Sequence, residues 1–167
     1  IGWIGSPSTA KYLEIVKESL SKLGQIEPVI LYLVGAGNNK ICIENVHVIS
    51  VPWSEKNEQI ALGKFDLGIM PLYNESWDKG KCAFKLIQYM ASFLPVIASN
   101  VGMNSEVVSN GENGFLAENS DEWFNALYEL HHNYELRKLM GEKGRALTIS
   151  RFTIQAKISD FLQFVGR

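Results

Sequence analysis

The stretch Asp66-Leu-Gly-Ile-Met-Pro-Leu-Tyr73 decides the fold, together with the segments that follow it as far as Ser99. Apolar runs, a polar stretch containing glycine and a helical spacing of apolar residues alternate here. They predict a strand at 67–70, a loop at 73–81, a helix at about 84–93 and a second strand at 95–98. This order is a βαβ unit. Because open α/β sheets bind ligands at the carboxyl ends of their strands, the loop is the first candidate site.

The predicted helix has two different faces. Apolar residues at helical spacing predict the face that packs on the sheet: Phe84, Ile87, Ala91 and Leu94. Lys85, Gln88 and Ser92 lie on another side, one turn after Lys81. The first N–H groups of a helix have no partner within it, so two lysines beside them predict an anion site. The same lysines also fit solvated surface charges. As part of a polar loop, Lys81 is expected to contribute little to folding.

Length and composition indicate a single soluble domain. The chain has 167 residues, of which 46% are hydrophobic and 20% charged, and its formal net charge is −2. A net negative charge does not indicate binding to nucleic acid or a polybasic contact with a membrane. Cys42 and Cys82 lack partners at metal-ligand spacing, so reduced thiols in the cytoplasm and no metal are expected. The chain has no signal peptide or bilayer-spanning run and begins without Met, so a piece of a longer protein is expected.

Strand and helix patterns alternate along the chain. They predict an α/β fold with a doubly wound, Rossmann-like parallel sheet of about six strands and helices at the C-terminus. Further predicted strands are 1–5, 28–34, 46–49 and 115–116. Further predicted helices are 9–23 with its stop at Gly24, 55–63, one capped by Ser120, one from Asn133, and one from Thr153 with the stripe Ile154, Ile158, Phe161 and Val165. A single helical turn is expected near 105–109.

Two other loops carry candidate ligand contacts. Ser6-Pro-Ser-Thr9 follows the first strand and presents the hydroxyls of Ser6, Ser8 and Thr9, either to a phosphate or as an ordinary helix cap. Trp53 follows the third strand and either stacks on a flat base or simply packs. No nucleophile elbow or Walker A motif occurs. The combination favours a phosphorylated ligand over catalysis by this chain alone.

Five short segments occur in an order and spacing shared with a known family. They are Asp66–Pro71, Tyr89–Ser99, Val101-Gly102, Glu106–Val108 and Gly111–Leu116. Together they resemble the C-terminal, donor-binding domain of retaining glycosyltransferases of family 4 (group 1), which have the two-domain GT-B fold. The resemblance covers nearly all of the chain.

The resemblance implies that residues 1–167 are the nucleotide-sugar-binding half, without the N-terminal acceptor domain. Such a fragment would bind a GDP- or UDP-linked donor but would not turn over, and it needs no cofactor. The complete enzyme would transfer a hexose-type sugar, with retention, to a glycan or lipid-linked acceptor in cell-surface polysaccharide or glycolipid assembly. Peripheral association with the inner face of the membrane, through the missing half, is a further expectation from the resemblance.

The sequence departs from the family at two glutamates, which are replaced by Gly80 and Gln88. A subset of the family has the same replacement, matched here by Trp77, Gly80, Lys81, Cys82, Lys85 and Gln88. Gln88 keeps a carbonyl oxygen that can accept from a ribose hydroxyl. The implied donor site consists of Ser6, Ser8, Thr9, Trp53, Gly80, Lys81, Lys85, Leu86 and Gln88. Lys81 is the best candidate for stabilising the leaving phosphate.

Two alternatives remain open from the sequence. One is a nucleotide-sugar epimerase of the same fold, which would differ in the acid and base groups of the missing half. The other is a non-catalytic nucleotide-binding or interaction domain, which the replacement of both glutamates also fits.

Overall fold

A single sheet of six parallel strands organises the fold. The computed structural model describes residues 1–166, with only the backbone at residues 159 and 160. The strands lie in the order β3-β2-β1-β4-β5-β6, and every paired neighbour is parallel. Their bounds are β1 Gly2–Ile4, β2 Val29–Val34, β3 Val46–Val51, β4 Gly68–Met70, β5 Val96–Ser99 and β6 Gly114–Ala117. The doubly wound sheet is therefore confirmed, and its order reverses between β1 and β4.

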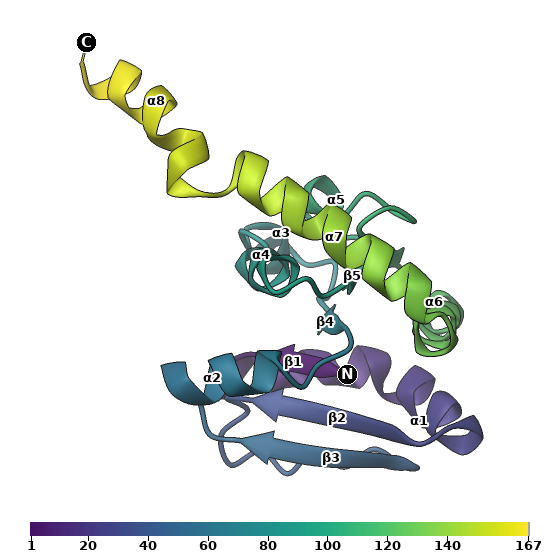
Figure 1. Ribbon diagram of the computed structural model, residues 1–167. Coiled ribbons are helices and arrows are strands. Elements are labelled where there is room, and N and C mark those ends of the chain that lie inside the picture. The colour runs from purple at the N-terminus through teal and green to yellow at the C-terminus, as the bar shows by residue number, and fades with distance from the viewer. Residues whose placement is uncertain (167) are drawn as a thin grey trace.

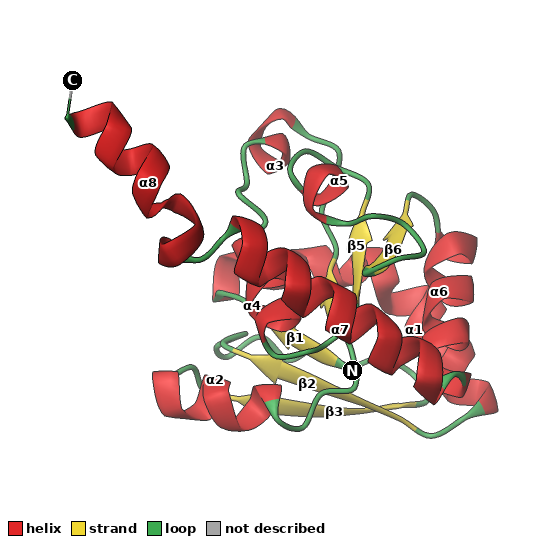
Figure 2. Cartoon of the chain, turned by 45° about the horizontal axis from the view of Figure 1, so that its top comes forward, coloured by secondary structure: helices red, strands yellow, loops and turns green. Residues whose placement is uncertain are grey.

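Helices cover both faces of this sheet (Figures 1 and 2). Their bounds are the 3₁₀ helix η1 Pro7–Val16, α1 Lys17–Ile26, α2 Glu55–Leu62, α3 Ser76–Lys79, α4 Phe84–Ala91, α5 Asn104–Val107, α6 Ser120–His132, α7 Tyr134–Arg151 and α8 Ile154–Val165. Two buried clusters result, one on each face. Trp3 of β1 packs into the first, which includes Leu20 of α1 and Leu127 of α6. Its neighbour Ile4 packs into the second, with Tyr89 of α4. Successive residues of a strand point to opposite faces, so one short strand anchors both cores.

The prediction for the buried face of α4 is wrong in part. Phe84 is 60% exposed, whereas Leu86, Tyr89 and Met90 are fully buried. The reason is that α4 packs on two neighbours at once. Tyr89 lies over Gly68 of β4, where an added Cβ would come within 2.4 Å of its ring, and Met90 lies similarly close to Gly144 of α7. One amphipathic stripe cannot describe a helix covered on two sides.

Several predicted boundaries also differ from the structure. The predicted helix 9–23 begins earlier, as η1, and α1 continues past Gly24 to Ile26. Gly24 does not stop the helix; it lies inside α1 and lets the chain at Asn45 approach closely. A Cβ at this position would come within 2.2 Å of the Asn45 carbonyl oxygen. The predicted loop 73–81 contains the short helix α3. Asn119 rather than Ser120 caps α6, by accepting from the N–H of Glu122 at 3.0 Å.

The stripe predicted for the last helix is exposed. Ile154, Ile158, Phe161 and Val165 are between 45% and 77% exposed, and α8 projects away from the sheet (Figures 1 and 2). Within residues 1–166, no helix has the length and apolar character needed to cross a membrane.

Candidate functional site

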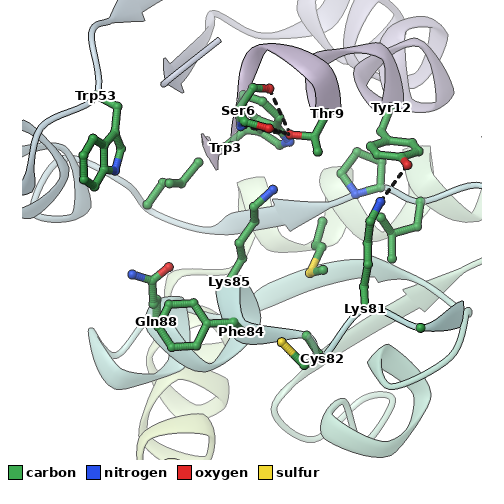
Figure 3. Close-up of a pocket in the computed structure, with 17 residues that line it drawn as sticks. Trp3, Ser6, Thr9, Tyr12, Trp53, Lys81, Cys82, Phe84, Lys85 and Gln88 are labelled. Atoms are coloured by element: carbon green, nitrogen blue, oxygen red, sulfur yellow. Dashed lines mark hydrogen bonds between the residues drawn. The ribbon is translucent and has the colours of Figure 1, made fainter. Parts of the chain in front are cut away.

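A pocket of about 500 Å³ opens at the carboxyl ends of β1 and β4, where the strand order reverses. Four segments line it (Figure 3): the end of β1 with the first part of η1, Trp53 after β3, residues 70–72 at the end of β4, and residues 80–85 with Gln88. Ligands bind at such switch points because the loops of neighbouring strands diverge there and leave a crevice.

The charged side chains that line this pocket are all positive. Of the described residues that line it, Lys81 and Lys85 are charged, and no aspartate or glutamate is among them. General acid–base catalysis most often uses a histidine or a carboxylate in reach of the ligand. The pocket is therefore suited to holding an anion, and its own lining supplies no carboxylate or imidazole for proton transfer.

Lys85 is a half-buried cation without a counter-ion. No ion pair involves it among the described residues, and its Nζ lies 5.1 Å from the centroid of the Trp3 ring. Burial, and secondly the nearby charge of Lys81, lower the pKa of Lys85 to about 8. The protein keeps a desolvated positive charge that nothing in the pocket neutralises.

The start of α4 adds further donors beside this lysine. The N-cap residue, Ala83, has left-handed backbone with φ of 54°, and no side chain caps the helix. The first N–H groups of a helix have no intrahelical partner and carry partial positive charge. Because Ala83, Phe84 and Lys85 all line the pocket, this uncapped end and the Lys85 ammonium form one cationic site.

Lys81 differs from Lys85 because it is already paired. Its Nζ lies 2.7 Å from the Oδ1 of Asp78 and donates to the Tyr12 hydroxyl at 2.6 Å (Figure 3). That hydroxyl in turn donates to the same Asp78 oxygen at 2.5 Å, and Asp78 is 1% exposed. Burial alone would lower the pKa of Lys81, but its bonds to Asp78 and Tyr12 outweigh burial and raise it. For Asp78 the same bonds outweigh burial and lower its pKa.

This pairing contradicts the expectation that Lys81 contributes little to folding. Removing it would leave a buried carboxylate without its counter-ion, which is costly. Since Asp78 neutralises Lys81, the net positive charge of the pocket comes from Lys85. Lys85, and not Lys81, is the stronger candidate for binding an anion.

The loop after β1 is held by hydrogen bonds between its own residues. The N–H of Ser6 donates to the Oγ1 of Thr9 at 2.9 Å, and the Thr9 hydroxyl donates to the Ser6 carbonyl oxygen at 3.0 Å (Figure 3). Ser6 and Thr9 line the pocket, while Ser8 does not and lies with its Oγ 3.0 Å from that of Ser6. The loop thus has the turn geometry of a helix start and also borders the pocket.

A carboxylate joins two lining residues at the opposite end from Lys81. Glu58 of α2 accepts from the Trp53 indole N–H at 2.7 Å and from the Gln88 amide at 2.8 Å. Trp53 and Gln88 occupy one end of the pocket, and Tyr12 and Lys81 the other (Figure 3). Trp53 is 62% exposed, so simple packing does not account for its position.

Sequence comparison assigns the family of this chain. Residues 1–133 match the family described as Glycosyl transferases group 1. The chain belongs to that family. Over 61 residues it is also 44% identical to an uncharacterized glycosyltransferase of Methanocaldococcus jannaschii, an alignment that covers 35% of this chain and 17% of the relative.

Solved structures show the same fold for this group 1 glycosyltransferase domain. Anabaena HepE in complex with UDP-glucose matches with a TM-score of 0.76 at 18% identity, over 99% of this chain and 48% of that one. A glycosyltransferase of Rickettsia africae matches with a TM-score of 0.75 at 17% identity, over 98% and 46%. The C-terminal domain of LpcC from Francisella tularensis gives 0.67 at 16%, over 92% and 86%. The sheet is thus the Rossmann-like domain of a GT-B fold, and the chain spans about half of the first two neighbours.

In the group 1 glycosyltransferase domain, most residues predicted from the sequence meet in the pocket. Ser6, Thr9, Trp53, Gly80, Lys81, Lys85 and Gln88 line it. Leu86 does not, because its side chain is fully buried in the core on the other side of α4.

Four residues that contact the predicted lysines and Gln88 were not predicted: Trp3, Tyr12, Glu58 and Asp78. Asp78 precedes Lys81 by three residues, a spacing at which helical side chains interact, so a local signal existed. Tyr12 and Glu58 lie far from their partners in the sequence, and no local pattern indicates such contacts.

In residues 1–166, no group of three or more His, Cys, Asp or Glu side chains is placed to hold a metal ion. Cys42 and Cys82 are free and exposed.

Proposed function

We propose that the pocket binds the nucleoside diphosphate part of a nucleotide sugar and that this chain is the donor-binding half of a retaining glycosyltransferase. Lys85 carries the proposal. A lysine that is desolvated and lacks a counter-ion is a cost to folding, and such costs are typical of functional sites. A diphosphate would supply the missing negative charge.

Two features support phosphate binding at the start of α4. The Lys85 ammonium and the uncapped helix end line the same pocket, and both favour negative charge in it. Lys81 lines the pocket nearby and adds a hydrogen-bond donor rather than net charge, since Asp78 neutralises it. The absence of aspartate and glutamate from the described lining avoids repulsion of the phosphates.

The nucleoside would then lie toward Trp53 and Gln88. The exposed Trp53 ring provides a flat face for a base, and Gln88 provides a carbonyl oxygen for a ribose hydroxyl. The pocket volume of about 500 Å³ is in the range that binds small ligands. The complex of the Anabaena neighbour with UDP-glucose is consistent with this ligand class.

In the complete enzyme, these groups would act on the leaving group. Cleavage of the bond between sugar and diphosphate places growing negative charge on the phosphate oxygens, so a cation there stabilises the transition state more than the ground state. The acceptor and the remaining catalytic groups would come from an N-terminal domain. We propose a hexose-type sugar from a GDP- or UDP-linked donor, with retention, and a glycan or lipid-linked acceptor at the cytoplasmic face of the membrane.

Calorimetry on the chain tests the proposal. UDP, GDP and ADP are titrated beside uridine, guanosine and adenosine, and at least one diphosphate should bind much more tightly than its nucleoside. Lys85→Met should reduce that preference by about tenfold or more, as for loss of a charge-assisted bond. Lys79→Met is the matched control, because Lys79 is exposed and does not line the pocket. Absence of binding for all three diphosphates at millimolar concentration would overturn the donor-binding function.

One observation also favours a non-catalytic nucleotide-binding domain, namely the absence of any carboxylate from the described lining. Product analysis of the full-length protein separates the two functions. Transfer of the sugar to an acceptor with retained anomeric configuration supports the enzyme. Binding of the nucleotide sugar without transfer, hydrolysis or epimerisation supports the non-catalytic domain.

A further inference from the structure

Glu58 contacts the pocket only through other residues. It does not line the cavity, yet one of its carboxylate oxygens accepts from the Trp53 Nε1–H at 2.7 Å and the other from the Gln88 Nε2 at 2.8 Å. Both of these partners do line the cavity. A single carboxylate on α2 therefore holds a residue from the loop after β3 and a residue from α4 in one arrangement.

The first consequence concerns the amide of Gln88. A carboxylate can only accept hydrogen bonds, so it selects the amide orientation that turns the NH₂ group toward it. The Gln88 carbonyl oxygen is then left for other partners, and an amide that could either donate or accept is held as an acceptor. A sugar or ribose hydroxyl is a donor of the matching kind.

The second consequence concerns the ring of Trp53. This side chain is 62% exposed, and the bond from its Nε1–H to Glu58 fixes where the indole lies. The start of α2 is itself held, because Ser54 accepts from the Asn57 N–H at 3.1 Å and the Asn57 amide donates to the Pro52 carbonyl oxygen at 2.9 Å. Glu58 thus extends from a fixed helix start, and pre-organised contacts of this kind reduce the entropic cost of binding.

We infer that Glu58 is a positioning residue for the nucleoside half of the ligand, which makes Gln88 a ribose-hydroxyl acceptor and holds Trp53 against the base. The inference rests on the proposed function, since it assumes that a nucleoside diphosphate occupies the pocket. The inference adds a determinant of specificity. Recognition of the ribose hydroxyl would depend on Glu58, a carboxylate that does not touch the ligand.

The test uses Glu58→Gln, which keeps shape and removes the second acceptor. A glutamine there has one acceptor oxygen in place of two. If that oxygen keeps the bond to Trp53, its NH₂ group faces Gln88, which then turns its amide and presents NH₂ to the pocket; if it keeps the bond to Gln88, Trp53 loses its partner. We expect Glu58→Gln to weaken the tightest-binding nucleoside diphosphate by about five- to tenfold, as for loss of one or two hydrogen bonds. Its preference for the ribonucleotide over the 2′-deoxy and 3′-deoxy forms should fall toward one. Binding of inorganic pyrophosphate should stay within about twofold of the parent, because Glu58 lies away from the phosphates.

Two further variants separate positioning from general structure. Glu55→Gln removes an exposed carboxylate from the first turn of the same helix and should leave all affinities unchanged. The exchange Glu58→Gln with Gln88→Glu restores the pairing in reverse: the residue at 58 donates, the residue at 88 accepts, and an acceptor oxygen again faces the pocket. This double variant should recover the ribose preference that the single variant loses.

The outcomes distinguish the inference from the function beneath it. If the parent binds no nucleoside diphosphate, the proposed function and the inference both fall. If the parent binds and discriminates the deoxy forms but Glu58→Gln discriminates equally well, the inference alone is overturned. Equal weakening of pyrophosphate and nucleotide, with no recovery in the exchange variant, would show that Glu58 only ties α2 to α4.

Discussion

Replacing Lys85 with methionine should stabilise the protein while weakening its affinity for a nucleoside diphosphate. Lys85 has a pKa of about 8 in the folded protein, against an ordinary value of 10.5. The unfolded chain therefore binds more protons than the folded one between pH 8 and 10.5, and the free energy of unfolding rises with pH across that window. Below pH 8, holding the lysine charged costs the folded state up to about 3 kcal/mol, at about 1.4 kcal/mol per pKa unit.

Methionine keeps much of the length of the side chain without the charge. Since the side chain is only half-buried, we expect Lys85→Met to raise the unfolding free energy at pH 7 by about 1–3 kcal/mol. Near pH 10 the parent lysine is neutral when folded, so the difference between variant and parent should shrink to a small part of that value.

Urea denaturation followed by circular dichroism, at pH 7 and pH 10, measures both quantities. Lys79→Met serves as the control, and as an exposed substitution it should stay within about 0.5 kcal/mol of the parent at both pH values. If Lys85→Met is less stable than the parent at pH 7, or if its advantage persists unchanged at pH 10, Lys85 is not an unpaired buried charge and the phosphate site loses its basis.

Three further substitutions follow from the contacts of the pocket. Lys81→Met should lower the unfolding free energy by about 2–3 kcal/mol, measured by the same denaturation, because Asp78 stays buried without its counter-ion; a loss under 0.5 kcal/mol would contradict the pairing. Tyr89→Phe should cost about 1–3 kcal/mol, since the buried N–H of Ile4 loses the acceptor 2.8 Å away, and an unchanged melting temperature would refute this. Gln88→Leu should weaken a nucleoside diphosphate by about 1 kcal/mol in calorimetry with little change in stability; unchanged affinity would remove Gln88 from the site.

The fold and the place of the site were predictable because they depend on local patterns. Continuous apolar runs mark strands that are buried on both faces, and the βαβ order around residues 67–98 sets the sheet edge at which the loops meet. Seven of the nine predicted site residues therefore line one pocket. The exceptions are Ser8, whose hydroxyl lies beside that of Ser6, and Leu86, whose side chain is buried in the core.

The roles of the two lysines could not be predicted, because they depend on tertiary partners. Lys81 is neutralised through Tyr12 and Asp78, and Tyr12 is brought there from the first helical segment by the packing of both cores. Lys85 has no such partner among the described residues. Sequence spacing places both ammonium groups near one helix end but does not show which one keeps its charge for a ligand.

Proton uptake on binding is the most direct test that the ligand phosphates meet Lys85. At pH 8 about half of the free molecules carry a neutral Lys85, since the pKa of this lysine is about 8, and a bound diphosphate would raise that pKa. Calorimetry with the tightest-binding nucleoside diphosphate, in buffers of different ionisation enthalpy, should therefore show uptake of about half a proton per molecule bound. The matching nucleoside, and Lys85→Met with the diphosphate, should show none. Binding of the diphosphate to the parent without proton uptake would contradict the central claim, because the phosphates would then lie away from Lys85.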